Sequence, residues 1–235
     1  MTLLLSRLEK TNPKMLFRFF IVGLAACAAF GSGQVQAQNP RVQIPFELHD
    51  KSLKLTEWAK QPMLLNPVAL SFDYQGRLFV VETARRGTVD IDIRAHKEWV
   101  IDDLSNQNIP QLRKMFRSRM APELSGQNKP WLQDRNQDGS HDWRDLMAVK
   151  ERIHLLQDTD DDGKADVAKV FAEGFNQEVN GVMAGVLPYR GDVFATIYPD
   201  VWKLNDTDHD GYADKREVFI HGFGVHAAFD GHDLH

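Results

Sequence analysis

An internal repeat of twenty residues sets strong limits on the fold. Residues 156–175 read LQDTDDDGKADVAKVFAEGF and residues 204–223 read LNDTDHDGYADKREVFIHGF, so twelve of the twenty positions match at a constant offset of 48. A period of about 40 to 50 residues is typical of stacked β-sheet units such as propeller blades. The two copies therefore predict a repeated β unit that contains an Asp-rich loop.

A second correspondence supplies the other half of the unit. Residues 68–81 contain two apolar runs on either side of the turn Tyr74-Gln75-Gly76, which predicts a hairpin, and residues 185–197 repeat this pattern at an offset of 115. Strand, tight turn, strand, Asp-rich loop and a further β run make a plausible four-stranded blade. We therefore expect an all-β fold, with residues 63–235 forming the N-terminal blades of a partial β-propeller. Two or three blades cannot close a ring, so we expect the chain to be truncated at its C-terminus.

A helical segment interrupts the β pattern at about residues 96–125. Leu112, Met115, Phe116 and Met120 recur at helical spacing with basic residues between them. This pattern predicts an inserted amphipathic helix whose basic residues form a solvated face.

The first residues are typical of an export signal. Lys14 and Arg18 precede a short apolar run, and a small-residue stretch ends at Ala37. This pattern predicts a secretory signal peptide over residues 1–37, followed by a linker with a first strand over residues 38–62, in a periplasmic or secreted protein. The alternative is a lipid anchor at Cys27, the chain's single cysteine, which follows a lipoprotein-like Leu-Ala-Ala sequence.

Removal of the signal would leave an acidic chain without cysteine. Its net charge would be −8, which is the −5 of the whole chain less the +3 of the removed segment. Acidic charge predicts that nucleic acid is not a partner. Without disulfides, bound calcium is the natural means of fixing loops.

Three Asp-rich loops carry the clearest chemical signal. Each places Asp or Asn at alternate positions and Gly at position six, where a calcium loop makes its sharp turn. Position seven can offer a backbone carbonyl, and position twelve is Asp145, Lys169 and Glu217 in turn. Lys169 cannot ligate a cation, so the second loop must complete its ligand set differently, through Asp166 or water. The predicted calcium ligands are Asp134, Asn136, Asp138, Ser140, Asp142 and Asp145; Asp158, Asp160, Asp162, Lys164 and Asp166; and Asp206, Asp208, Asp210, Tyr212, Asp214 and Glu217.

Several stretches together resemble a known family. These are residues 128–146, 151–160, 199–208 and 221–226, where distinctive flanks such as Asn128-Lys-Pro-Trp131 accompany the Asp loops. Over roughly residues 60–235 the chain is similar to the bacterial glucose/sorbosone dehydrogenase-like quinoprotein propellers. It resembles in particular the large planctomycete-type proteins with a "membrane-bound dehydrogenase domain".

The resemblance implies a six-bladed propeller that oxidises an aldose or aldehyde with pyrroloquinoline quinone. His232 is the best positional match to the family's general base, and the family's quinone-contacting residues match none in this chain. Expected partners are a small sugar or aldehyde and a haem c electron acceptor. The alternative from another class is a non-catalytic, calcium-dependent carbohydrate- or protein-binding module, because Asp134 and Asp158 start 24 residues apart, as in tandem dockerin-type loops.

Overall fold

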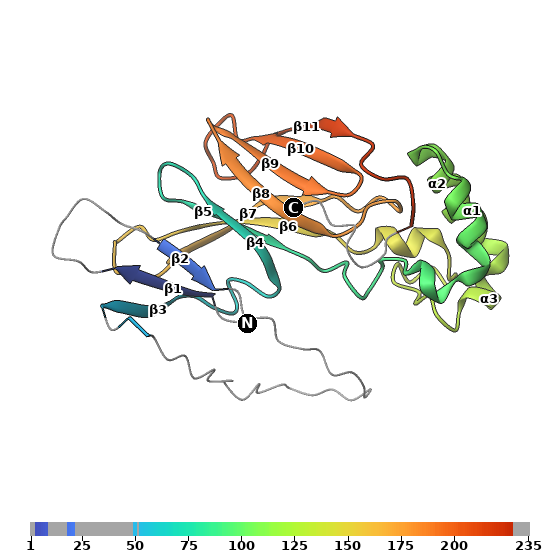
Figure 1. Cartoon of the computed structure of the whole chain (residues 1–235), viewed down its shortest axis with the longest axis horizontal. Helices are drawn as coiled ribbons and strands as arrows, with labels where there is room; N and C mark the ends of the chain where they lie inside the picture. The colour runs from blue at the N-terminus through green and yellow to red at the C-terminus, as the bar shows by residue number, and fades with distance from the viewer. Residues whose placement is uncertain (1–2, 9–17, 22–48, 51, 228–235) are drawn as a thin grey trace.

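The computed structural model describes residues 3–8, 18–21, 49–50 and 52–227 of the 235-residue chain. It is mostly β, with two four-stranded antiparallel sheets, a smaller N-terminal sheet, and helices gathered at one end (Figure 1). The N-terminal sheet has the order β2 (Arg18–Ile21), β1 (Leu3–Leu8) and β3 (Leu53–Ala59). Cys27 and Ala37 lie outside the described residues, so signal cleavage and lipidation stay predictions.

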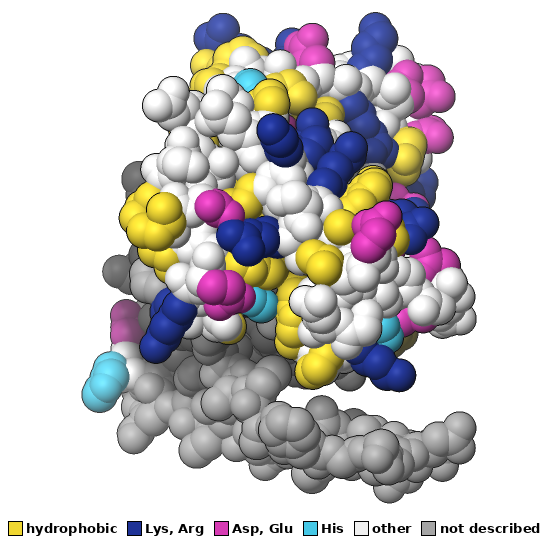
Figure 2. All heavy atoms as spheres, turned by 90° about the vertical axis from the view of Figure 1, so that its right-hand side faces the viewer, with side chains coloured by type: hydrophobic (Ala, Val, Ile, Leu, Met, Phe, Trp, Pro, Cys, Tyr) yellow, Lys and Arg dark blue, Asp and Glu magenta, His cyan; other side chains and the backbone are white. Residues whose placement is uncertain are grey.

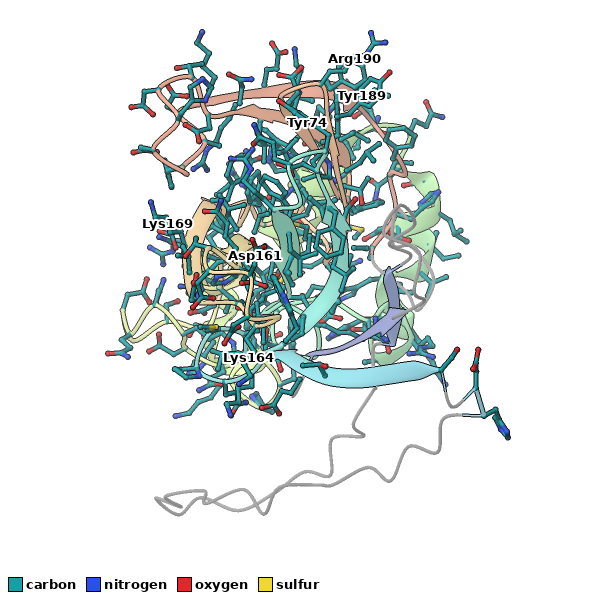
Figure 3. The ribbon with its side chains drawn as sticks, turned by 90° about the vertical axis from the view of Figure 1, so that its left-hand side faces the viewer. Tyr74, Asp161, Lys164, Lys169, Tyr189 and Arg190 are labelled. Atoms are coloured by element: carbon teal, nitrogen blue, oxygen red, sulfur yellow. The ribbon has the colours of Figure 1, made fainter. Side chains whose placement is uncertain are left out.

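Each four-stranded sheet runs in chain order. The first sheet consists of β4 (Pro67–Phe72), β5 (Leu78–Glu82), β6 (Glu151–Gln157) and β7 (Val167–Gly174). The second sheet consists of β8 (Met183–Tyr189), β9 (Asp192–Ile197), β10 (Asp200–Asn205) and β11 (Lys215–His221). The predicted hairpins are confirmed as β4–β5 and β8–β9. Their turn residues Tyr74, Tyr189 and Arg190 lie together at one end of the molecule (Figure 3).

The sequence repeat is a structural repeat. Residues 158–166 join the third strand of the first sheet to its fourth, and residues 206–214 make the same connection in the second sheet. The first Asp-rich loop, residues 134–142, instead lies among the helices between β5 and β6. Within the described residues the sheets are stacked and do not close into a ring (Figure 1).

The three sheets pack on one another through two equivalent hydrophobic cores, one between each pair of neighbouring sheets. Between β3 and the first sheet, Trp58 packs with Leu78, Val80 and Leu156. Between the two four-stranded sheets, Phe171 packs with the repeat equivalents of those three aliphatic residues, Val193, Ala195 and Leu204. The same face of each sheet is therefore used to pack on the sheet before it.

A backbone hydrogen bond reinforces each of these packings. The Ala165 N–H donates to the Trp58 carbonyl, and the equivalent Ala213 N–H donates to the Phe171 carbonyl, both at 2.7 Å. Both alanines are buried and belong to the Asp-rich loops. Each loop thus fastens its own sheet to the edge strand of the preceding one.

Short helices form the insertion. They are η1 (Ile93–Ala95), η2 (Lys97–Trp99), α1 (Val100–Ser105), α2 (Ile109–Arg119), η3 (Pro122–Leu124), α3 (Ser125–Asn128) and η4 (Trp143–Met147). The helix α2 begins after Asn108, whose side chain accepts the Gln111 N–H, and it buries the predicted apolar stripe. Among the described helices, none has the length and apolar character needed to cross a bilayer.

Basic side chains gather on the outer face of the insertion (Figure 2). Arg113 and Arg117 both contact the carboxylate of Glu178, and Arg119 pairs with Asp102. The two pairs with Glu178 hold α2 against the chain between β7 and β8, and the pair with Asp102 holds α2 against α1.

The insertion also contains a buried histidine with a testable pH response. His96 is stacked on Trp99, with ring centroids 4.0 Å apart, and contacts the edge of Trp131. Burial lowers the pKa of His96 below its usual range, although Glu98 and Asp92 oppose this shift. Since the unfolded chain then binds more protons, stability present at neutral pH is lost as the pH falls through about 6.5 and below.

We therefore expect the free energy of unfolding to decrease between about pH 7.5 and pH 5.5, and to decrease less in His96→Gln. Urea denaturation of both proteins over this range measures the difference. Equal pH slopes would show that His96 is not responsible.

Candidate metal centres

The three Asp-rich loops share one backbone conformation. At position four, Gln137, Asp161 and His209 have φ angles of 60°, 60° and 61°. Position six is glycine in each loop, with φ between 84° and 91°, where a side chain would be strained. The shared conformation arises from the sequence pattern, because each first aspartate accepts the glycine N–H and each fifth accepts the N–H of position seven.

Three carboxylates converge in both loops that join β-strands. Ligand oxygens of Asp158, Asp160 and Asp162 all lie within 4.8 Å of one another, and those of Asp206, Asp208 and Asp210 do the same. Like charges at this separation repel each other unless a cation lies between them. Alternate carboxylates on a tight loop are the oxygen-rich arrangement that calcium prefers.

One oxygen of the second loop stands out. Asp158 Oδ2 accepts the Gly163 N–H at 3.0 Å, whereas Asp158 Oδ1 is buried and has no hydrogen-bond partner. A buried carboxylate oxygen without a donor is costly. A cation among the three carboxylates would remove this cost.

The aspartate at position nine of each of these two loops is not one of the three converging carboxylates. Asp166 accepts both the N–H and the hydroxyl of Thr159, and Asp214 accepts the same two groups of Thr207. These bonds lower the pKa of Asp166 and Asp214. Both aspartates therefore fold the loop back on its second residue, while their role as ligands stays a prediction.

Predicted ligands at positions seven and twelve also have structural roles. The N–H groups of Lys164 and Tyr212 donate to the fifth aspartate of their loops. Glu217 lies opposite Lys203 on β10, with Nζ and Oε1 3.5 Å apart, and is outside the group of three converging aspartates. Lys169 extends from β7 and donates to the Asp210 carbonyl in the next loop (Figure 3).

The first loop differs because a cation from the adjoining helix η4 lies against its carboxylates. The guanidinium of Arg144 contacts Asp142 at 2.6 Å and Asp138 at 3.4 Å. Arg144 thereby lowers the pKa of Asp142 to about 2. Asp145 is fully buried and accepts the N–H groups of Arg135, Asn136 and Asp142.

The remaining predicted ligands of the first loop hold its turn together. Asp134 accepts the N–H groups of Asp138 and Gly139, and Asn136 contacts Asp138. The Ser140 N–H donates to Asp138. Arg144 therefore compensates part of the acidic charge of the first loop.

The chain matches the model of a family described as a domain of unknown function, DUF7133, over residues 46–234. It belongs to this family. The DUF7133 match spans β3, both four-stranded sheets, the insertion and all three Asp-rich loops. No curated protein and no solved structure matches the chain.

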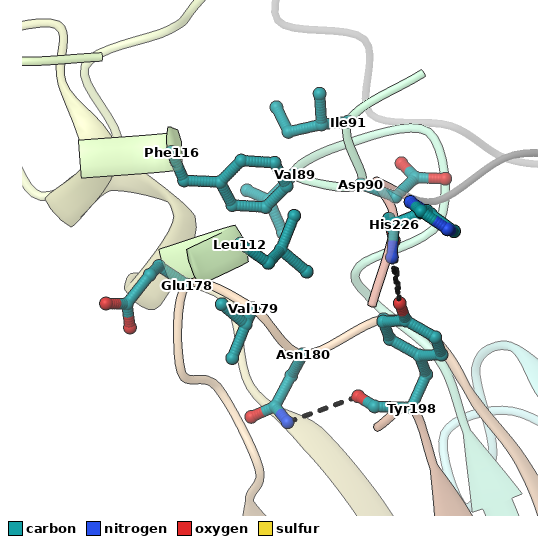
Figure 4. A pocket seen from close by; sticks show the side chains of 11 residues that line it. Val89, Asp90, Ile91, Leu112, Phe116, Glu178, Val179, Asn180, Tyr198 and His226 are labelled. Atoms are coloured by element: carbon teal, nitrogen blue, oxygen red, sulfur yellow. Dashed lines mark hydrogen bonds between the residues drawn. The ribbon is translucent and has the colours of Figure 1, made fainter. Parts of the chain in front are cut away.

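The histidines of this DUF7133 chain do not form a metal cluster among the described residues. His221 pairs with Asp200 at the edge of the second sheet, with Nδ1 and Oδ1 2.5 Å apart. The ring of His226 contacts the Asp103 carbonyl at 2.8 Å, and its backbone bonds to the hydroxyl of Tyr198 (Figure 4). The predicted general base, His232, lies outside the described residues.

The pocket beside Tyr198 and His226 encloses only about 10 Å³, roughly the space of one water molecule (Figure 4). Burial raises the pKa of Tyr198 to about 12, so its hydroxyl remains protonated and donates to the His226 carbonyl. This pocket does not fit a quinone or a sugar, and residues beside it bond His226 and Ala227 to Asp103 of the insertion.

Sequence reasoning missed the residues that connect the metal loops to their surroundings. Thr159 and Thr207 close the loops, and Ala165 and Ala213 dock them on the preceding sheet. All four are identical between the repeats, which was the available signal. The first loop has Arg135 and His141 at these positions, in agreement with its different place in the fold.

Proposed function

We propose that this DUF7133 chain is a calcium-binding segment of a β-propeller, in which one ion fixes each Asp-rich loop between a third and a fourth strand. The observation that supports this most strongly is the convergence of three carboxylates in two repeat-equivalent loops. The partnerless Asp158 oxygen supports it independently. Calcium would serve a structural purpose, because these loops also dock one sheet on another.

Two ions are proposed, not three. In the first loop Arg144 already neutralises part of the acidic charge, and its Nη2 would be repelled by an ion at Asp138. Calcium binding by Asp134, Asn136 and Asp138 stays a prediction from the sequence.

Isothermal titration of the metal-free protein with calcium tests the proposal. We expect two ions per chain, and loss of one ion in each of Asp160→Asn and Asp208→Asn. Asn preserves the shape and the acceptor oxygen but removes the charge. The matched control is Asp161→Asn, which removes an exposed charge from the same loop without removing a member of the converging group. Titration without binding, or equal loss in the control, would contradict the proposal.

Aldose or aldehyde oxidation with pyrroloquinoline quinone stays a separate proposal from the family resemblance. Its catalytic residue is His232, and none of its quinone contacts is assigned to this chain. A non-catalytic binding module is compatible with the same calcium result. Dye reduction by the quinone-loaded protein separates these two activities.

A further inference from the structure

The outer face of the second sheet resembles the face of the first sheet that the second sheet covers. In the first sheet, Phe79 and Phe171 form an edge-to-face pair, with centroids 4.9 Å apart, that is buried against the second sheet. In the second sheet, Phe194 and Phe219 form the equivalent pair, 5.1 Å apart. These residues follow the repeat offsets of 115 and 48.

The two pairs differ in exposure. Phe79 and Phe171 are 1% and 3% exposed, whereas Phe219 is 56% exposed and its neighbour Ile220 is 45% exposed. Leu187 lies opposite Phe194 in the strand register and is 56% exposed. An aromatic pair surrounded by exposed aliphatic side chains is typical of an interaction surface.

Strand registers show that these residues share one face. Val193, Ala195 and Leu204 point toward the first sheet, so the alternating residues Phe194 and Val201 point away from it. Both sheets also have a register shift at the same place, between Ile153 and His154 and between Val201 and Trp202. The face is therefore the repeat equivalent of the one that the second sheet itself covers.

We propose that this face, defined by Leu187, Phe194, Val201, Phe219 and Ile220, binds a further four-stranded sheet of the same repeat. The partner would present an aliphatic face like that of Val193, Ala195 and Leu204. It would also carry a Gly-x-Ala-Asp loop, whose Ala N–H would donate to the Phe219 carbonyl. This continues the two stacking bonds already present, from Ala165 to Trp58 and from Ala213 to Phe171. The inference extends the proposed propeller arrangement and does not depend on calcium binding by the chain itself.

The part of this face that would contact the partner's Asp-rich loop determines which sheet packs best against it. The first sheet offers Leu155 and Lys169 to the next Asp-rich loop, and Leu155 lies close to Gly211 of that loop. The second sheet has Lys203 and Glu217 at these positions. A partner identical to the second sheet would therefore fit imperfectly here, and Lys203→Leu should improve its fit.

The test uses the whole chain extended after His235 by a second copy of residues 175–222. The rate of cysteine alkylation measures whether the added sheet covers the proposed face. In a Cys27→Ser background, Ile220→Cys of the original unit reports on the face, and Ile101→Cys, which is on α1, is the control. We expect the extension to slow alkylation at position 220 by at least about tenfold and to leave position 101 unchanged. Phe219→Asp in the original unit should restore fast alkylation, and Lys203→Leu should slow it further.

Two results would overturn the proposal. One is unchanged alkylation at position 220 in the extended chain, even with Lys203→Leu. The other is slow, concentration-dependent alkylation in the unextended chain, which would show that a second copy covers the face. Calcium stoichiometry of the unextended chain is measured separately, so failure of docking and failure of calcium binding are distinguishable.

Discussion

Removal of calcium is expected to lower the free energy of unfolding by about 5 kcal/mol when the comparison is made at free calcium about 100 times the dissociation constant. Each site that binds only the folded state contributes about 2.7 kcal/mol under this condition, and two sites are proposed. Calcium binding is expected to be limited to the folded state because the loops connect strands and also dock the sheets through Ala165 and Ala213. Urea denaturation in calcium and in chelator measures the difference.

A substitution that removes a ligand charge should change the free energy of unfolding in opposite directions with and without calcium. Asp160→Asn and Asp208→Asn should each destabilise the protein in calcium, because a ligand charge is lost. In chelator each should leave stability unchanged or raise it, because repulsion within the carboxylate group is relieved. Asp161→Asn should show no such reversal.

Magnesium supplies a second control for this prediction. It is smaller than calcium and gives up its water ligands reluctantly, so it should stabilise the protein less at equal concentration. An unfolding midpoint that is the same in chelator and in calcium would contradict the metal sites.

Replacement of Arg85 by Met is expected to lower the free energy of unfolding by about 3 to 5 kcal/mol, the usual cost of removing one member of a buried charged network. Arg85 is fully buried, and its guanidinium donates to four backbone carbonyls. They belong to Leu146, Val149, Gln177 and Asn180, at 2.7 to 3.3 Å. One side chain thus joins the end of the insertion to the segment between β7 and β8.

The charge of Arg85 is also matched by a buried carboxylate. Glu151 accepts the Arg85 and Ala84 N–H groups and the Thr83 hydroxyl through Oε1, and the Met183 N–H through Oε2. Burial raises the pKa of Glu151, and these hydrogen bonds oppose the shift. Without the guanidinium, four carbonyls would lose a donor and Glu151 would lose its neighbouring positive charge.

The matched control for Arg85→Met is Arg152→Met. Arg152 is on β6 next to Glu151, but its side chain is 43% exposed and it pairs with Glu173 at the surface. Its loss should cost no more than about 1 kcal/mol. Similar destabilisation of the two variants in urea denaturation would show that the Arg85 network is not a main source of stability.

Sequence patterns predicted the β-rich fold, the two hairpins, the repeat and an inserted amphipathic helix. These predictions succeeded because hydrophobic periodicity and turn residues depend on residues that are close in sequence. The Tyr74-Gln75-Gly76 turn lies between its strands, and Leu112, Met115 and Phe116 share one helix face. The propeller itself remains a proposal, because within the described residues the stacked sheets are not closed.

The conformation of the three Asp-rich loops follows from their local residues alone. Each loop needs only a carboxylate at position one, a glycine at position six and the hydrogen bond between them. These groups lie within nine residues, so all three loops adopt the same turn wherever they occur. The sequence also recorded the docking residues, Ala165 and Ala213, as identities between the repeats.

The surroundings of each loop, in contrast, depend on tertiary packing. It placed two loops between strands, with three carboxylates converging, and placed the first among helices, where Arg144 supplies the cation. It also buried Arg85, whose guanidinium joins segments up to 95 residues apart, near the buried carboxylate of Glu151. The physical reason is that burial and charge compensation depend on which distant segments pack together, and local patterns do not encode those partners.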